Sequence, residues 1–104
     1  MENSSNKTQL SVVIPVYNEE KSIAACLETL KSQSYKDFEL IVVDNNCTDK
    51  TAEIAKQYGA RVVPCVPQGI ASARNEGAKQ ARGDILAFID ADARLSETWI
   101  ERAL

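Results

Sequence analysis

Two aspartates, Asp90 and Asp92, carry the clearest chemical signal in this sequence. They follow an apolar run and lie two residues apart, so in an extended segment both carboxylates face the same way. Two like charges at that spacing repel each other. This repulsion costs energy unless a cation or hydrogen-bond donors that also bind a partner offset it. A divalent metal that joins the pair to a diphosphate would meet this need. For an isolated pair, a polar loop that caps the next helix is the alternative.

Further polar residues follow two other apolar runs, where parallel strands would end. Asp44 can accept hydrogen bonds from a nucleobase edge or a ribose, or it can form an Asx turn ahead of the next helix. Tyr17 can stack on a base or pack as a half-buried aromatic, and Glu19 can contact a nucleotide or favour a helix start. Arg74 can reach a phosphate or remain solvated. Because open α/β sheets bind ligands at the carboxyl ends of their strands, we expect one site at this edge.

Composition limits the chemistry and the partners. The chain has 104 residues, with 12 Lys and Arg against 15 Asp and Glu, and a formal net charge of −3. This length and charge suit one globular domain, and an acidic balance without a basic run argues against nucleic acid or an anionic membrane as partner. The absence of histidine from the sequence excludes His-based triads and zinc sites with histidine ligands. A metal must therefore be held by carboxylates and ligand oxygens, which favours Mg²⁺ or Mn²⁺.

Cysteines and apolar runs bear on the compartment. The three cysteines form no CxxC pair, and we interpret Cys26 as a small apolar core residue and Cys47 and Cys65 as ordinary thiols. The longest apolar runs are strand-sized, so no segment is expected to span a bilayer. Residues 1–9 are polar and lack the apolar core of a signal peptide. A cytoplasmic protein is predicted, with membrane association left open for a longer form.

Apolar periodicity alternates between strand and helix along the chain. Strands are predicted at Leu10–Val16, Phe38–Val43, Arg61–Val63 and Ile85–Ile89. Helices are predicted at Glu20–Gln33, Thr51–Tyr58, Ile70–Arg82 and after Ser96, which is expected to cap the last one. This alternation indicates an α/β fold with a mostly parallel sheet covered on both faces. Residues 1–9 are predicted to be a flexible segment before one domain at 10–104.

Glycines and the last helix add detail to this prediction. Gly59 and Gly83 are expected to end the second and third helices, and Gly77 to pack closely against the sheet. The last helix has only roughly two turns, without a C-cap, when the sequence stops at Leu104. We expect the chain to be the front part of a larger domain, and its cut sheet edge to favour self-association.

Three motifs, in order and at consistent spacing, resemble those of family 2 glycosyltransferases with the GT-A fold. They are SVVIPVYNEE at 11–20, FELIVVDNNCTDKT at 38–51 and GIASARNEGAKQARGDILAFIDAD at 69–92. The resemblance extends from Leu10 to Leu104. It implies a Rossmann-like, three-layer α/β/α architecture of GT-A type. It also implies transfer of a sugar from a nucleotide-diphosphate donor to an acceptor hydroxyl, usually with inversion.

The resemblance implies roles for residues that match the family by position. Pro15, Tyr17 and Glu19 would line the nucleotide pocket, and Asp44 would bind the base, commonly uracil. The donor is therefore expected to be a nucleotide sugar, UDP-sugar above all. The acceptor, whether sugar, lipid or protein, is not specified by these motifs.

The aspartate pair takes the metal role in this resemblance. Asp90 would contact the ribose or metal-bound water, and Asp92 would ligate Mn²⁺ or Mg²⁺ on the donor diphosphate. In the family the catalytic base lies beyond the aspartate pair, so it is expected after Leu104. Asp84 lies at the wrong end of its strand for that role. We therefore expect the donor-binding half of the enzyme, weakly active or inactive alone.

Three other interpretations compete with this one. Phosphatases of the haloacid-dehalogenase type also carry aspartates two apart, but on the first strand and followed by Thr or Val, where this chain has Arg94. Rossmann dinucleotide binding is disfavoured because the first strand–helix turn is not glycine-rich. The alternative that stays open is a non-catalytic nucleotide-binding or assembly domain.

Overall fold

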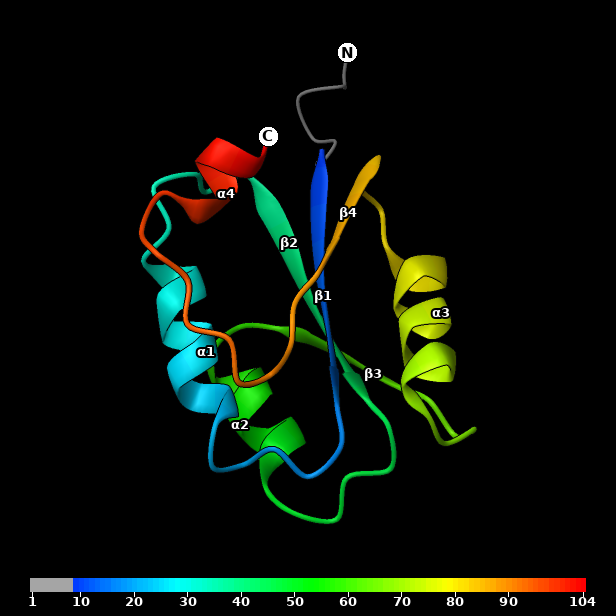
Figure 1. Ribbon diagram of the computed structural model, residues 1–104. Coiled ribbons are helices and arrows are strands. Elements are labelled where there is room, and N and C mark those ends of the chain that lie inside the picture. The colour runs from blue at the N-terminus through cyan, green and yellow to red at the C-terminus, as the bar shows by residue number, and fades with distance from the viewer. Residues whose placement is uncertain (1–8) are drawn as a thin grey trace.

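Four parallel strands form one sheet in the order β3-β2-β1-β4 (Figure 1). The computed structural model describes residues 9–104, so most of the segment predicted to be flexible, residues 1–8, lies outside the described residues. The strands are β1 (Leu10–Val16), β2 (Phe38–Asp44), β3 (Arg61–Pro64) and β4 (Ile85–Phe88). The helices are α1 (Ile23–Lys31), α2 (Thr51–Gln57), α3 (Ile70–Gln80) and α4 (Trp99–Ala103).

The order of the strands creates a topological switch beside β1. The chain moves from β1 outward to β2 and β3, and then returns to place β4 on the other side of β1. Ligands of such sheets bind outside the carboxyl ends of the strands at this kind of switch. The topology therefore predicts a ligand site beside the segment that follows β1.

Alternation of side chains along β1 builds two cores. Four of its residues pack into one buried cluster with α1, α2 and α4, and they are Leu10, Val12, Ile14 and Val16. Val13 points to the opposite face and packs with Ala73 of α3. Figure 1 shows α1 and α2 on one side of the sheet and α3 on the other. The predicted three-layer α/β/α arrangement is confirmed.

Helix α1 is shorter at its start than predicted. Its buried residues, Ile23, Cys26, Leu27 and Leu30, recur at the expected helical spacing. The helix begins at Ile23 rather than at Glu20, because the preceding backbone is bound elsewhere. The N–H of Glu19 donates to Thr51 Oγ1 at 2.8 Å, and the N–H of Glu20 donates to Asp49 Oδ2 at 3.2 Å. These bonds hold the segment as a loop joined to the start of α2.

Helix α3 packs on the sheet through Gly77. A Cβ at this position would collide with the side chain of Val13 and would lie 3.1 Å from Val43 Cγ2, so the predicted close packing is confirmed. The helix ends at Gln80, and the prediction that Gly83 closes it is wrong. Gly83 instead lies where the chain approaches β1, and a Cβ there would be 2.9 Å from the carbonyl oxygen of Gln9.

Helix α4 is positioned by a buried glutamine. Gln33 is fully buried, its Nε2 donates to the carbonyl of Ser96 at 2.7 Å, and its Oε1 accepts from the N–H of Ile100 at 3.0 Å. The residue before the helix is Thr98, so the predicted cap at Ser96 is wrong. The Ser96 hydroxyl accepts a bond from Arg102 instead. No helix within residues 9–104 has the length and apolar character needed to cross a membrane.

Candidate functional site

A pocket of about 140 Å³ lies at the carboxyl end of β1, beside the start of α3. We call it the strand-end pocket, and its lining residues are Pro15, Val16, Tyr17, Glu19, Asn45, Gln68, Gly69, Ile70 and Ala73. Three of the residues predicted to contact a nucleotide, Pro15, Tyr17 and Glu19, therefore share one cavity. Its position at the topological switch is the one expected for a ligand site in an open α/β sheet.

The loop that presents Tyr17 is held by the loop that precedes α2. Asn18 has a left-handed backbone (φ 53°), and its Oδ1 accepts from the N–H of Thr48 at 2.8 Å. The N–H of Lys50 donates to Glu20 Oε1 at 2.9 Å. With this support the Tyr17 side chain remains 53% exposed, which leaves the ring available to stack on a planar ligand.

Asp44 ends β2 next to the pocket but does not line it. It is the register partner of Val16, and its Oδ1 accepts from the N–H of Cys47 at 2.8 Å. This is the local turn that the sequence left open as an alternative. A carboxylate has further acceptor capacity beyond one such bond, so the turn and a ligand contact are compatible.

Cys47 is an inert thiol in this arrangement. Burial and the neighbouring Asp44 carboxylate raise the pKa of its thiol to about 11. Its Sγ accepts a bond from the N–H of Asn18 at 3.2 Å. A thiol with this pKa stays protonated at neutral pH, and a protonated thiol is a poor nucleophile.

Asp90 and Asp92 lie in the loop that follows β4, outside the lining of the strand-end pocket. Both are exposed. Ile89, which precedes Asp90, and Ala91, which lies between the two aspartates, are buried in the core cluster on the α1 side. This alternation places both carboxylates on the exposed side of the segment, as the spacing predicted. Figure 1 shows the loop curving toward α1, away from α3.

The aspartate pair suits a metal that arrives with its ligand. No group of three or more His, Cys, Asp or Glu side chains within residues 9–104 is arranged to hold a metal ion. No hydrogen bond or ion pair between described residues involves the carboxylate of Asp90 or Asp92. Exposed carboxylate oxygens are the ligand type that Mg²⁺ and Mn²⁺ prefer, so Asp92, with Asp90 two residues away, would be able to hold such an ion. The residues thus fit a cation shared with a diphosphate.

Arg74 does not point into the strand-end pocket. Its guanidinium lies over the ring of Phe88, 5.8 Å from the ring centroid, and it is absent from the pocket lining. An arginine in this geometry gains a modest cation–π stabilisation. The structure therefore favours a surface contact over the phosphate role that the sequence left open.

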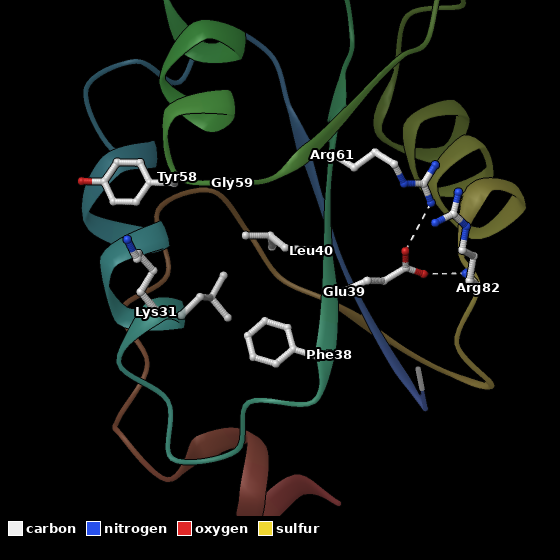
Figure 2. A pocket seen from close by; sticks show the side chains of 9 residues that line it. Lys31, Phe38, Glu39, Leu40, Tyr58, Gly59, Arg61 and Arg82 are labelled. Atoms are coloured by element: carbon white, nitrogen blue, oxygen red, sulfur yellow. Dashed lines mark hydrogen bonds and ion pairs between the residues drawn. The ribbon is translucent and has the colours of Figure 1, made fainter. Parts of the chain in front are cut away.

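A second hollow, of about 390 Å³, lies at the other end of the sheet beside β2 (Figure 2). Glu39 extends into it between Arg61 and Arg82, whereas Phe38 and Leu40 point toward the α1 side. The Glu39 carboxylate accepts from Arg61 Nη2 at 3.3 Å and from the backbone N–H of Arg82. Its charge is thus engaged within the fold, and no predicted site residue lines this hollow.

Sequence reasoning missed part of the strand-end pocket. Asn45, Gln68 and Gly69 line it, and none of them was given a role of its own. Asn45 follows Asp44 at the strand end, and Gly69 immediately precedes a helix, so position relative to the elements was the available signal. The contribution of each residue depends on contacts with residues twenty or more positions away in the sequence, which no local pattern encodes.

Most of this chain is similar in sequence to known proteins. Residues 11–104 match the family described as "Glycosyl transferase family 2". The chain is 41% identical over 103 residues to glycosyltransferase AglE of Haloferax volcanii, covering 91% of this chain and 34% of the relative.

Two solved structures share the fold. A crystal structure of S. aureus TarS in complex with UDP-GlcNAc matches with a TM-score of 0.86 and 32% identity, over 91% of this chain and 30% of that one. Glucosyl-3-phosphoglycerate synthase from Mycobacterium tuberculosis, in complex with Mn²⁺, UDP and glucosyl-3-phosphoglycerate, matches with a TM-score of 0.70 and 31% identity. That match covers 88% of this chain and 37% of the synthase. The chain thus spans about a third of the length of the proteins it matches.

Proposed function

The chain belongs to glycosyl transferase family 2, and we propose that it forms the donor-binding half of an enzyme that transfers a sugar from a nucleotide-diphosphate sugar to an acceptor hydroxyl. The observation that carries the proposal is the strand-end pocket, which gathers Pro15, Tyr17 and Glu19 at the topological switch of the sheet. The similarity to S. aureus TarS, a protein crystallised with UDP-GlcNAc, supports a UDP-sugar as donor.

Each residue then has a stated part in holding the donor. The exposed ring of Tyr17 stacks on the base, while Pro15 and Glu19 close the sides of the pocket. Asp44 accepts hydrogen bonds from the base edge through the acceptor capacity that its turn leaves. These contacts orient the nucleotide so that its diphosphate leaves the pocket toward the loop after β4.

The aspartate pair would hold the diphosphate end of the donor through a cation, Mn²⁺ or Mg²⁺. Asp92 would ligate the ion, and Asp90 would contact the ribose or a water on the ion. When bound, the cation supplies charge stabilisation for the leaving diphosphate. A complex of the related synthase with Mn²⁺ and UDP supports this use of a metal.

The rest of the reaction is assigned to sequence beyond this chain. We propose that the base that deprotonates the acceptor lies after Leu104 and that transfer proceeds with inversion. The chain alone is then expected to bind the donor with little or no turnover. A non-catalytic nucleotide-binding domain makes the same prediction for the chain, and sugar transfer by a longer form separates the two.

The test is a calorimetric titration of UDP into the chain, with Mn²⁺ and with chelator. Asp92→Asn should weaken binding about ten- to hundredfold in Mn²⁺ and leave binding in chelator unchanged, because an amide is a poorer ligand for a hard cation. Asp44→Asn should weaken binding in both conditions, since its partner is the base.

Asp37→Asn is the matched control, because Asp37 is an exposed aspartate at the other end of the sheet. It should bind UDP like the unaltered chain. Melting curves should be the same for all variants, since Asn retains the acceptor that the Asp44 turn needs. Persistence of the full metal dependence in Asp92→Asn would refute the assigned metal role.

A further inference from the structure

Asn45 is a buried amide whose hydrogen-bonding groups are all engaged. Its side chain lies at the end of β2 and the residue is only 3% exposed. Nδ2 donates to the carbonyl oxygens of Cys65 and Pro67, each at 2.9 Å. Oδ1 accepts from the backbone N–H of Gly69 at 2.9 Å and from Gln68 Nε2 at 3.2 Å. One side chain thus fixes the segment between β3 and α3.

The backbone of Asn45 connects this segment to the other side of the pocket. Its N–H donates to the carbonyl of Val16 at 3.0 Å, directly before Tyr17. Gly69, which Asn45 holds, has a positive φ of 128° and precedes Ile70, the first residue of α3. Asn45 therefore joins the β1 side of the strand-end pocket to the α3 side.

We propose that Asn45 is a positioning residue for the donor site, which sets the shape of the strand-end pocket by holding residues 65–69 against the ends of β1 and β2. The inference rests on the proposed function. Asn45 acts through the groups it holds, Gln68, Gly69 and the start of α3, which line the pocket with it.

The chemistry of the position requires an amide. Two carbonyl oxygens face Nδ2, so they need a donor, and the N–H of Gly69 faces Oδ1, so it needs an acceptor. An aspartate of the same shape would keep the acceptor and turn a second oxygen toward two carbonyls. The segment would then move away from β2, because buried acceptors without donors are costly.

Asn46 provides a matched control in the same loop. It also binds this segment, with Nδ2 donating to the carbonyl of Val66 and to Gln68 Oε1, each at 2.8 Å. Unlike Asn45, it is exposed and does not line the pocket. Removal of its bonds frees one end of Gln68 and the carbonyl of Val66, and it leaves the bonds of Asn45 to Cys65, Pro67 and Gly69 in place.

The experiment compares Asn45→Asp, Asn45→Ser and Asn46→Gly with the unaltered chain, at a temperature where melting curves show each to be folded. Glycine is used at position 46 because the backbone there is left-handed (φ 68°). UDP is titrated with Mn²⁺, and amide exchange is followed at Gly69. Asn45→Asp should weaken UDP binding about tenfold or more. Asn45→Ser, which replaces the amide with one shorter hydroxyl able to donate one hydrogen bond, should have an intermediate affinity. Both should lose protection at the Gly69 amide relative to amides in β1.

Asn46→Gly should keep the affinity within about threefold, since the bonds from Asn45 to Cys65, Pro67 and Gly69 remain. A normal affinity in Asn45→Asp or in Asn45→Ser, with a lower melting temperature alone, would overturn the positioning role. If Asn45→Asp does not fold, Asn45→Ser decides the question by the same criterion. Failure of the unaltered chain to bind UDP would overturn the proposed function and this inference together, which is a distinct result.

Discussion

Glu39 is held by donors from two strands and from the segment that follows α3. Ser11 of β1, Arg61 of β3 and the backbone N–H of Arg82 all donate to its carboxylate. Burial acts to raise the pKa of this carboxyl, but the bonds from Ser11, Arg82 and Arg61 together lower it below its ordinary value of 4.5. The ionised form is therefore favoured by the fold.

The sign of the pH dependence follows from that lowered pKa. The stabilisation from Glu39 is fully present above pH 4.5 and is lost as the pH falls through the folded-state pKa. Glu39→Gln should lower the free energy of unfolding at pH 7 by about 1–3 kcal/mol. The difference from the unaltered chain should shrink in acid, where Glu39 itself becomes neutral. Urea unfolding at neutral and acid pH measures both.

Glu53→Gln is the control for this prediction, because Glu53 is exposed on α2. It should change the free energy of unfolding by less than about 0.5 kcal/mol at either pH. An equal effect of Glu39→Gln at both pH values would show that the loss comes from packing rather than from charge.

At the site, single residues were predictable where their position followed from a strand end. The position of Tyr17 and Glu19 after the apolar run of β1 allowed a nucleotide contact, and the family resemblance implied one. The structure places both residues in the strand-end pocket. The role of Asn45 was not predicted, because it depends on partners twenty or more residues away. Asp90 was predicted to lie at the same edge of the sheet as Tyr17. The direction in which its loop turns depends on the packing of Ile89 in the core cluster on the α1 side.

Helix α3 depends on a residue without a side chain. A Cβ at Gly77 would collide with Val13 in β1, so Gly77→Ala must push the helix away from the sheet. We expect this substitution to lower the free energy of unfolding by about 1–3 kcal/mol despite the better helix propensity of alanine. Lys79→Ala, on the exposed side of the same helix, should change it by less than about 0.5 kcal/mol. Chemical denaturation of the two variants tests this, and a stabilised Gly77→Ala would contradict the packing described.

Elements were predictable to the extent that their signals are local. β1 was predicted at its observed bounds, because a continuous apolar run between polar segments marks a buried strand. Helix α1 was predicted to begin too early, because the residues before it are bonded to the start of α2. Helix α3 was predicted to end too late, because the chain approaches β1 at Gly83. The strand order had no local signal, since it depends on how β4 returns beside β1.

On the scale of the whole molecule, β4 is an apolar outer strand. It pairs with β1 on one side, and no strand among residues 9–104 pairs with its other side. Ile85, Leu86 and Phe88 are 39%, 38% and 42% exposed. A sheet edge of this kind offers unpaired backbone groups and apolar side chains to another chain.

We therefore expect the isolated chain to associate through β4 at high concentration. Sedimentation velocity should show dimers or larger species as the concentration approaches the millimolar range. Leu86→Lys should shift the monomer–dimer equilibrium toward monomer by about tenfold or more, because a charge at the edge opposes strand pairing. Val66→Lys is the control, since Val66 is 77% exposed but lies after β3, on the far side of the sheet. Equal effects of the two substitutions would mean that association follows general hydrophobicity. A monomer at every concentration would mean that the exposed side chains of β4 are too few to hold two copies together.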